Sequence, residues 1–223
     1  MSEDFLKIWY NVIMQKSNFR EWTLDKIDDT FGLSQVSTLP ILEELLSFQY
    51  NINDFEERYL SILRNNYLNY GGDNWNEVEL ENKLISPIIV FSEMDNKHFA
   101  YFLERELAIT IDEHELSGKV DGMIATGFRS PKKPYFCLNE YKRGTDPNGD
   151  PQGQALIAML VAQKLNSNQK PIFGSYIIGR HWYFLALVGN EYAISTDFSS
   201  VDEGLFEIYR ILKGLRIQIE KML

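Results

Sequence analysis

Apolar positions in the first part of the chain recur at the three- and four-residue spacing of amphipathic helices. The stretches are residues 5–13, 39–46 and 55–63. A stripe with this period faces a core while the remaining side chains face water. Thr23 favours a helix start and Gly32 a helix end. The pattern predicts a helical N-terminal lobe over residues 1–70, and contact with a protein partner or with a second copy is its expected role.

Beyond Gly71 and Gly72 the pattern changes, and these glycines mark the expected domain boundary. Asn76 is a plausible cap for a helix with an apolar face, and Asp150 with Pro151 favours the start of another helix. Apolar and aromatic runs predict the strands, which are residues 99–111, 116–126, 135–142 and 172–178, followed by a hairpin over 182–196. A last amphipathic helix is expected over 202–221. Residues 71–223 therefore read as one α/β domain.

Three charged residues interrupt the apolar strands. Asp121 lies inside the strand 116–126, while Glu140 and Lys142 end the next strand and share one of its faces. Ionised side chains are costly to bury unless they are paired or bound to a metal. A solvent-exposed ion pair at a strand end is the simpler explanation of Glu140 and Lys142. The alternative is a Mg²⁺ or Mn²⁺ ion between Asp121 and Glu140, because these cations prefer oxygen ligands.

This arrangement, an Asp on one strand and Glu140-Tyr141-Lys142 ending the next, resembles the PD-(D/E)XK superfamily of restriction-endonuclease-like phosphodiesterases. The Pro that often precedes the Asp is Val120 here. The helix after Asn76 is similar to the one that opens the N-terminal nuclease domain of type I restriction enzyme motor subunits. The matching residues are Glu77, Lys83, Ile85 and Pro87, with the basic residue one place late. The resemblance covers about residues 76–180.

The resemblance implies a core of the order αβββαβ, a mixed sheet flanked by helices. It also implies that Glu77, Asp121, Glu140 and the Tyr141 backbone carbonyl bind the metal. Glu79 and Glu81 are the alternatives to Glu77, which otherwise simply suits the first turn of a helix.

The resemblance assigns roles to two further side chains. Lys142 would activate the attacking water and stabilise charge on the scissile phosphate. Gln154, in the pair Gln154-Ala155, would orient Lys142 or the phosphate, and local capping of its own helix is the alternative.

The composition of the chain indicates the cellular compartment that is expected for the protein. The single cysteine, Cys137, excludes a disulfide framework and fits a core position in a reducing compartment. No signal peptide is recognised and no apolar run is long enough to span a bilayer, so a cytoplasmic protein without membrane contact is expected.

The formal net charge of −10 argues against broad electrostatic binding of nucleic acid. Basic residues do gather on and beside the proposed site strands, namely Arg129, Lys132, Lys133, Lys142 and Arg143. A solvated turn is the alternative explanation for Lys132 and Lys133.

The sequence therefore predicts a metal-dependent phosphodiesterase, an endonuclease-like hydrolase acting on nucleic acid, with DNA as the expected substrate. The alternative is a nuclease-fold module without catalytic activity that binds other proteins, because fold does not fix function. A third hypothesis rests only on charge: an acidic substrate mimic or immunity protein that occupies the basic groove of a partner.

Overall fold

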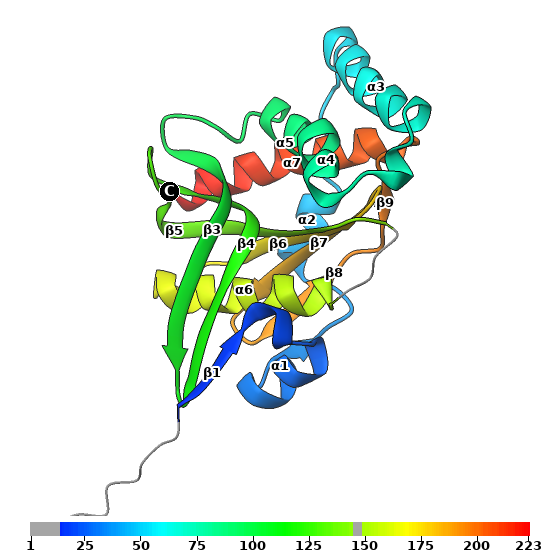
Figure 1. Cartoon of the computed structure of the whole chain (residues 1–223). Helices are drawn as coiled ribbons and strands as arrows, with labels where there is room; N and C mark the ends of the chain where they lie inside the picture. The colour runs from blue at the N-terminus through cyan, green and yellow to red at the C-terminus, as the bar shows by residue number, and fades with distance from the viewer. Residues whose placement is uncertain (1–13, 145–148) are drawn as a thin grey trace, which may run out of the picture.

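The computed structural model describes residues 14–144 and 149–223, and within them nine strands form one mixed sheet with helices on both faces (Figure 1). The strands are β1 (Gln15–Asn18), β2 (Ser34–Gln35), β3 (Phe99–Ile111), β4 (His114–Thr126), β5 (Lys132–Lys142), β6 (Ile172–Ile178), β7 (His181–Val188), β8 (Glu191–Ile194) and β9 (Phe198–Ser199). The α-helices are α1 (Leu24–Phe31), α2 (Pro40–Leu46), α3 (Asp54–Asn69), α4 (Glu77–Leu80), α5 (Ser86–Phe91), α6 (Pro151–Asn166) and α7 (Gly204–Met222). Two short 3₁₀ turns, η1 (Phe19–Glu21) and η2 (Gly72–Asn74), and a π-helical segment, η3 (Glu81–Ile85), complete the order.

The central strands combine antiparallel and parallel pairing. Strands β3, β4 and β5 form an antiparallel meander, and β6, β7 and β8 form another. The two meanders join through the parallel pair β5 and β6. A parallel connection needs a crossover, and α6 supplies it. The expected α/β class, with a mixed sheet flanked by helices, is confirmed.

Each face of the sheet buries its own apolar core. One core contains α6, with Trp22 and Ile27 from the segment around α1. Ten consecutive residues of α6, from Gly153 to Ala162, are buried, as is typical of a helix that is apolar on all sides. The other core contains residues of α2, α3, α5 and α7, which lie on the opposite face of the sheet in Figure 1.

The N-terminal part of the chain differs from its prediction. The expected helix over residues 5–13 lies outside the described residues, and α1, α2 and α3 are helical as predicted. However, β1 pairs in parallel with β4, and β2 pairs in parallel with β8. Neither strand has an alternating apolar pattern, since β1 reads QKSN and β2 reads SQ, so only backbone pairing with distant segments reveals them. The division into two domains at residue 70 stays a prediction, although both strands belong to the common sheet.

Two local features depart from simple sequence patterns. His114 follows the polar turn between β3 and β4 and begins β4, where its ring contacts Trp22 and Phe31 edge to face. Along α3 the predicted apolar face included Phe55 and Ile62, which are exposed. The buried residues of α3 are Glu56, Leu60, Leu63 and Tyr67. Among the described residues, no helix is both long and apolar enough to cross a membrane.

Candidate active site

The predicted site residues meet in a fork where two strands separate. Along one edge of β4, β5 pairs only as far as Gly122, while β1 pairs with residues up to Ser117. Asp121 lies between these two stretches. Figure 1 shows β5 turning away from β4 in this region. The backbone N–H of Tyr141 donates to Asp121 Oδ2 at 2.6 Å. This hydrogen bond connects β5 to the site residue of β4 across the fork.

Lys142 connects the two acids that flank it. Its Nζ lies 2.6 Å from Glu140 Oε1, and both side chains are buried. The same Nζ lies 3.9 Å from Oε1 of Glu77, a side chain that is more than half exposed. Asn76 caps α4 and thereby fixes the turn that carries Glu77. The ion pair of Glu140 and Lys142 is therefore buried, contrary to the simpler solvent-exposed explanation.

The carboxyl groups in the fork are held in unfavourable surroundings for negative charge. Burial, followed by the charge of Asp121, raises the pKa of Glu140 to about 7, against the lowering effect of Lys142. Burial likewise raises the pKa of Asp121, although the hydrogen bond from Tyr141 acts in the opposite direction. The two groups lie close enough to repel each other. A cation between them would offset both burial and repulsion.

Beneath the fork, Tyr101 contacts Tyr141 and helps to fix its position. The hydroxyls of Tyr101 and Tyr141 lie 2.6 Å apart, and burial raises the pKa of both. A Cβ at Gly122 would lie 2.6 Å from the Tyr141 hydroxyl, so the glycine leaves the space that the pair occupies. Gly122, which follows Asp121, thus leaves room for the side chain of Tyr141, which follows Glu140.

Two further charged residues lie beside the fork: Glu81, which the sequence analysis gave as an alternative to Glu77, and Arg20, which it did not single out. Burial and the charge of Asp121 raise the pKa of Glu81, a half-buried residue of η3. The spacing of four residues places Glu81 on the same side of the helix as Glu77. Arg20, in η1, is close enough to lower the pKa of Asp121 and of Glu140. No sequence signal identifies Arg20, because the pairing that brings it here joins distant segments.

Gln154 is buried at the start of α6, but its amide contact is local. Its Nε2 donates to the backbone carbonyl of Asp150 at 3.3 Å, which is the contact expected of a glutamine that caps its own helix. The proposed action of Gln154 on Lys142 or on a phosphate stays a prediction.

A surface cavity lies beside α4, next to the fork. A cavity of about 360 Å³ is lined there by Asn76, Glu77, Val78 and Arg143. Glu77 and Arg143 thus border the solvent side of the fork, while Glu140 and Lys142 lie on its buried side.

The donor chemistry of the fork fits Mg²⁺ in part. Asp121 and Glu140 offer carboxylate oxygens, and Mg²⁺ in proteins is often held by one or two carboxylates together with waters and substrate oxygens. Within residues 14–144 and 149–223, however, no three His, Cys, Asp or Glu side chains gather as a metal-binding group. The structure thus offers two acids for a cation, and Glu77 and the Tyr141 carbonyl as further ligands stay predictions.

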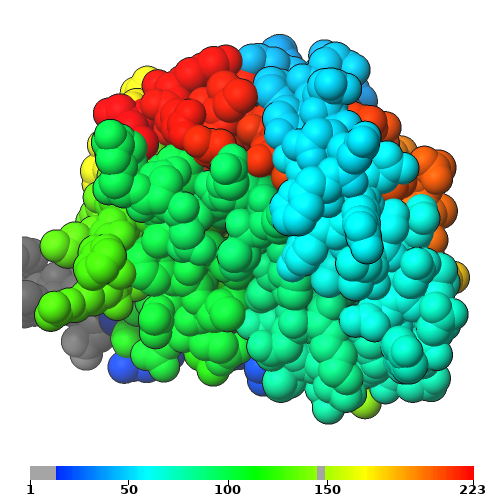
Figure 2. Space-filling view, turned by 90° about the horizontal axis from the view of Figure 1, so that it is seen from above, coloured from blue at the N-terminus to red at the C-terminus, as the bar shows by residue number. Residues whose placement is uncertain are grey.

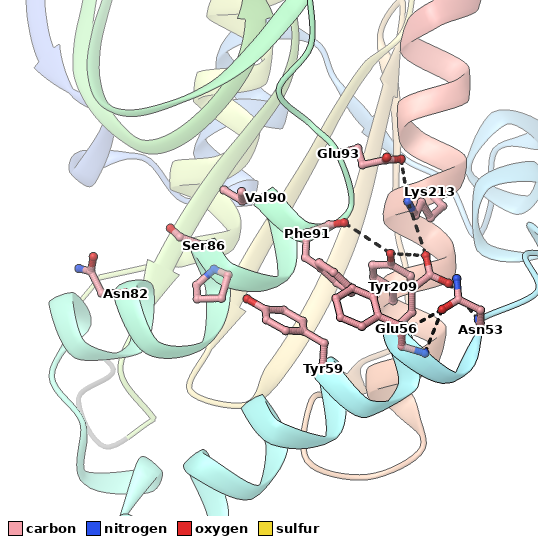
Figure 3. A pocket seen from close by; sticks show the side chains of 12 residues that line it. Asn53, Glu56, Tyr59, Asn82, Ser86, Val90, Phe91, Glu93, Tyr209 and Lys213 are labelled. Atoms are coloured by element: carbon pink, nitrogen blue, oxygen red, sulfur yellow. Dashed lines mark hydrogen bonds and ion pairs between the residues drawn. The ribbon is translucent and has the colours of Figure 1, made fainter.

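A larger cavity, of about 840 Å³, lies between α3, α5 and α7 and has a different character. Seen from above, α3 and α7 border this face of the molecule (Figure 2). Figure 3 shows the rings of Tyr59, Phe91 and Tyr209 beside one another, with Glu56 at the start of α3. Glu56 accepts hydrogen bonds from Tyr209, from Tyr50 and from the backbone of Asn53. This carboxylate is satisfied within the protein, which indicates a structural role.

Comparison of the sequence with protein-family models finds no match, and comparison with curated proteins finds none either.

Proposed function

We propose that this protein is a metal-dependent phosphodiesterase, endonuclease-like, with DNA as its substrate. One observation carries the proposal: Asp121, Glu140 and Lys142, from two strands that separate at this point, converge in one partly buried fork. Buried acids that repel each other beside a buried amine reduce stability, and a cation-binding catalytic site accounts for them.

The order and direction of the elements support the restriction-endonuclease-like core implied by the resemblance. A helix (α4 to α5) precedes three antiparallel strands, α6 crosses over, and β6 returns parallel to β5. Asp121 stands on the second of these strands and Glu140-Tyr141-Lys142 ends the third, as in the family pattern.

The residues of the fork divide the hydrolysis of a phosphodiester between them. Asp121 and Glu140 would hold the cation, which when bound supplies positive charge for the phosphate and for a water ligand. Lys142 holds or deprotonates the water that attacks phosphorus in line with the leaving oxygen. The new bond joins water oxygen to phosphorus as the bond to the leaving oxygen breaks. Glu77 lies within reach of the amine and helps to orient it.

Replacement of Lys142 tests this function. We expect Lys142→Ala to lose cleavage of plasmid DNA in Mg²⁺ or Mn²⁺, since no other amine is described in the fork. The matched control is Lys164→Ala, an exposed lysine in the last turn of α6. Circular dichroism checks that both variants fold, and Lys142→Met keeps the bulk of the side chain if the alanine variant does not. Cleavage by a folded Lys142 variant at the parental rate would contradict the assignment.

A protein-binding module without catalytic activity is the second candidate, and one observation favours it. Lys142 already neutralises Glu140, and the described residues contain no cluster of three metal-binding side chains. Thermal denaturation with and without Mn²⁺ separates the two candidates. A metal-dependent enzyme gains stability from Mn²⁺ in the parent and not in Asp121→Asn. Equal behaviour of both proteins would favour the binding module.

A further inference from the structure

The turn η1 places one exposed arginine between two buried aromatic residues. Phe19 is 3% exposed and Trp22 is 1% exposed, whereas Arg20 between them is exposed. The side chains of Asn18 and Glu21 form a capping box that closes this turn. Arg20 is therefore displayed by a rigid turn and not by a loose N-terminal segment.

Two glycines allow η1 to dock beside the fork. A Cβ at Gly118 of β4 would lie 2.3 Å from the Phe19 ring, and a Cβ at Gly153 of α6 would lie 2.2 Å from the Trp22 carbonyl oxygen. Gly118 precedes Asp121 by three positions, and Gly153 precedes Gln154. The turn is thus wedged between the strand that carries Asp121 and the start of α6.

Within the part of the chain that the structure describes, the guanidinium of Arg20 forms no hydrogen bond and no salt bridge. Its backbone N–H donates to Asn18 Oδ1 at 3.1 Å inside the turn, so the turn is closed without the use of the side chain. Three other arginines do form salt bridges: Arg64 with Glu203, Arg210 with Glu207 and Arg216 with Glu93. The five N–H donors of Arg20 remain available to a ligand.

We propose that Arg20 is a substrate-binding residue that contacts a backbone phosphate of the nucleic acid beside the fork. This inference rests on the proposed function. A guanidinium matches the non-bridging oxygens of a phosphate in a bidentate manner, and phosphate contacts fix the register of a nucleic acid. In a chain with a net charge of −10, one unpaired cation at the site has a large local effect.

Binding of a fluorescein-labelled DNA duplex, measured by anisotropy in Ca²⁺ at several salt concentrations, tests the inference. The proteins are the full-length parent, Arg20→Ala, Arg20→Lys and Arg58→Ala. Arg58 is the matched control because it is exposed and lies on α3. We expect Arg20→Ala to weaken binding about tenfold and to reduce the salt slope by about one. Arg20→Lys keeps the charge and the slope but loses part of the affinity, and Arg58→Ala behaves as the parent.

The outcomes separate this inference from the proposed function. Equal affinity and slope in Arg20→Ala and the parent would overturn the role of Arg20, while cleavage that depends on Lys142 would still support the enzyme. Binding that depends on Arg20 in a protein that never cleaves would support the phosphate contact and overturn the catalytic proposal. Failure of the parent to bind any duplex would overturn the inference, as would an equal loss in Arg58→Ala.

Discussion

Glu140 and Glu56 are both buried, yet their surroundings shift their pKa values in opposite directions. Burial and the charge of Asp121 raise the pKa of Glu140 to about 7, and Lys142 only partly compensates. Burial acts on Glu56 too, but hydrogen bonds from Asn53, Tyr50 and Tyr209 outweigh it and lower the pKa below its ordinary value. The hydrogen bonds of Glu56 thus stabilise its charged form, whereas Lys142 stabilises the charged form of Glu140 only in part. This contrast distinguishes a structural carboxylate from a candidate catalytic one.

The lowered pKa of Glu56 makes stability depend on pH. A carboxyl with a lower pKa in the folded state stabilises the fold above its unfolded pKa, about 4.3, and loses this contribution as pH falls through the folded pKa. Glu56→Gln should therefore lower the free energy of unfolding at pH 7 by about 1–3 kcal/mol, because it disrupts a buried charged hydrogen-bond network. Urea denaturation of parent and variant across the acidic range measures the difference.

The neighbouring Glu57 provides the control for this prediction. It is exposed on the same helix, so Glu57→Gln should match the parent at every pH. The difference in the free energy of unfolding between Glu56→Gln and the parent should become smaller as the solution becomes more acidic. A difference in the free energy of unfolding that stays constant from neutral to acidic pH would show that the charge of Glu56 does not stabilise the fold.

At the scale of elements, α6 holds the two sides of the site together. Its first turn contacts η1, its buried face fills one core of the sheet, and it connects β5 to β6. Because α6 is apolar on all sides, it must be buried on the side that faces the sheet and on the side that faces away from it. The segment around α1 packs on the side that faces away from the sheet. The position of Arg20 thus depends on the fit between η1 and α6.

Gly153→Ala tests this fit. The new Cβ would meet the Trp22 carbonyl oxygen at 2.2 Å and the Thr23 Cα at 2.8 Å, and both are backbone atoms that cannot rotate away. Alanine improves helix propensity by up to about 1 kcal/mol, but overpacking against backbone costs about 1–3 kcal/mol. We expect a lower melting temperature in thermal denaturation.

Gly144→Ala is the control, because among the residues that the structure describes a Cβ there would meet Gly179 Cα at an ordinary 3.7 Å. Its melting temperature should stay near that of the parent. A Gly153→Ala protein as stable as the parent would show that η1 does not pack against α6 as described.

At the scale of the whole molecule, the N-terminal segment is integrated into the sheet. Residues of α1 and α3 bond to distant parts of the chain, as in Tyr192 to Asp28 at 3.1 Å and Tyr209 to Glu56 at 2.8 Å. The helices α2 and α3 also contribute to the core that contains α7. These contacts favour a single cooperative unit over two independent domains.

Unfolding should therefore occur in one transition. Thermal or urea denaturation followed by tryptophan fluorescence and by far-ultraviolet circular dichroism should give coincident curves. A fragment of residues 71–223 should fail to fold, since it lacks β1, β2 and the helices α1, α2 and α3. Two separate transitions, or a folded fragment, would instead support the division at residue 70 that the sequence predicts.

The sequence alone determined the elements whose signals are local. Strands β3 and β6 have the predicted bounds, α6 begins at its Asp150 cap, and Asn76 caps the helix that carries Glu77. Periodicity and capping act over a few neighbouring residues, so they can be read without knowledge of the fold. The residue types Asp121, Glu140 and Lys142 stood out for the same reason, as charges inside apolar runs.

Only the tertiary structure decided what these residues face. The pairing of β1 with β4, the wedge of η1 against α6, and the approach of Arg20 and Glu81 to Asp121 join segments far apart in the chain. Such contacts depend on the closure of long loops and on backbone pairing that is indifferent to side-chain pattern. The burial that raises the pKa of Glu140 is likewise a property of the assembled fork and of no single segment.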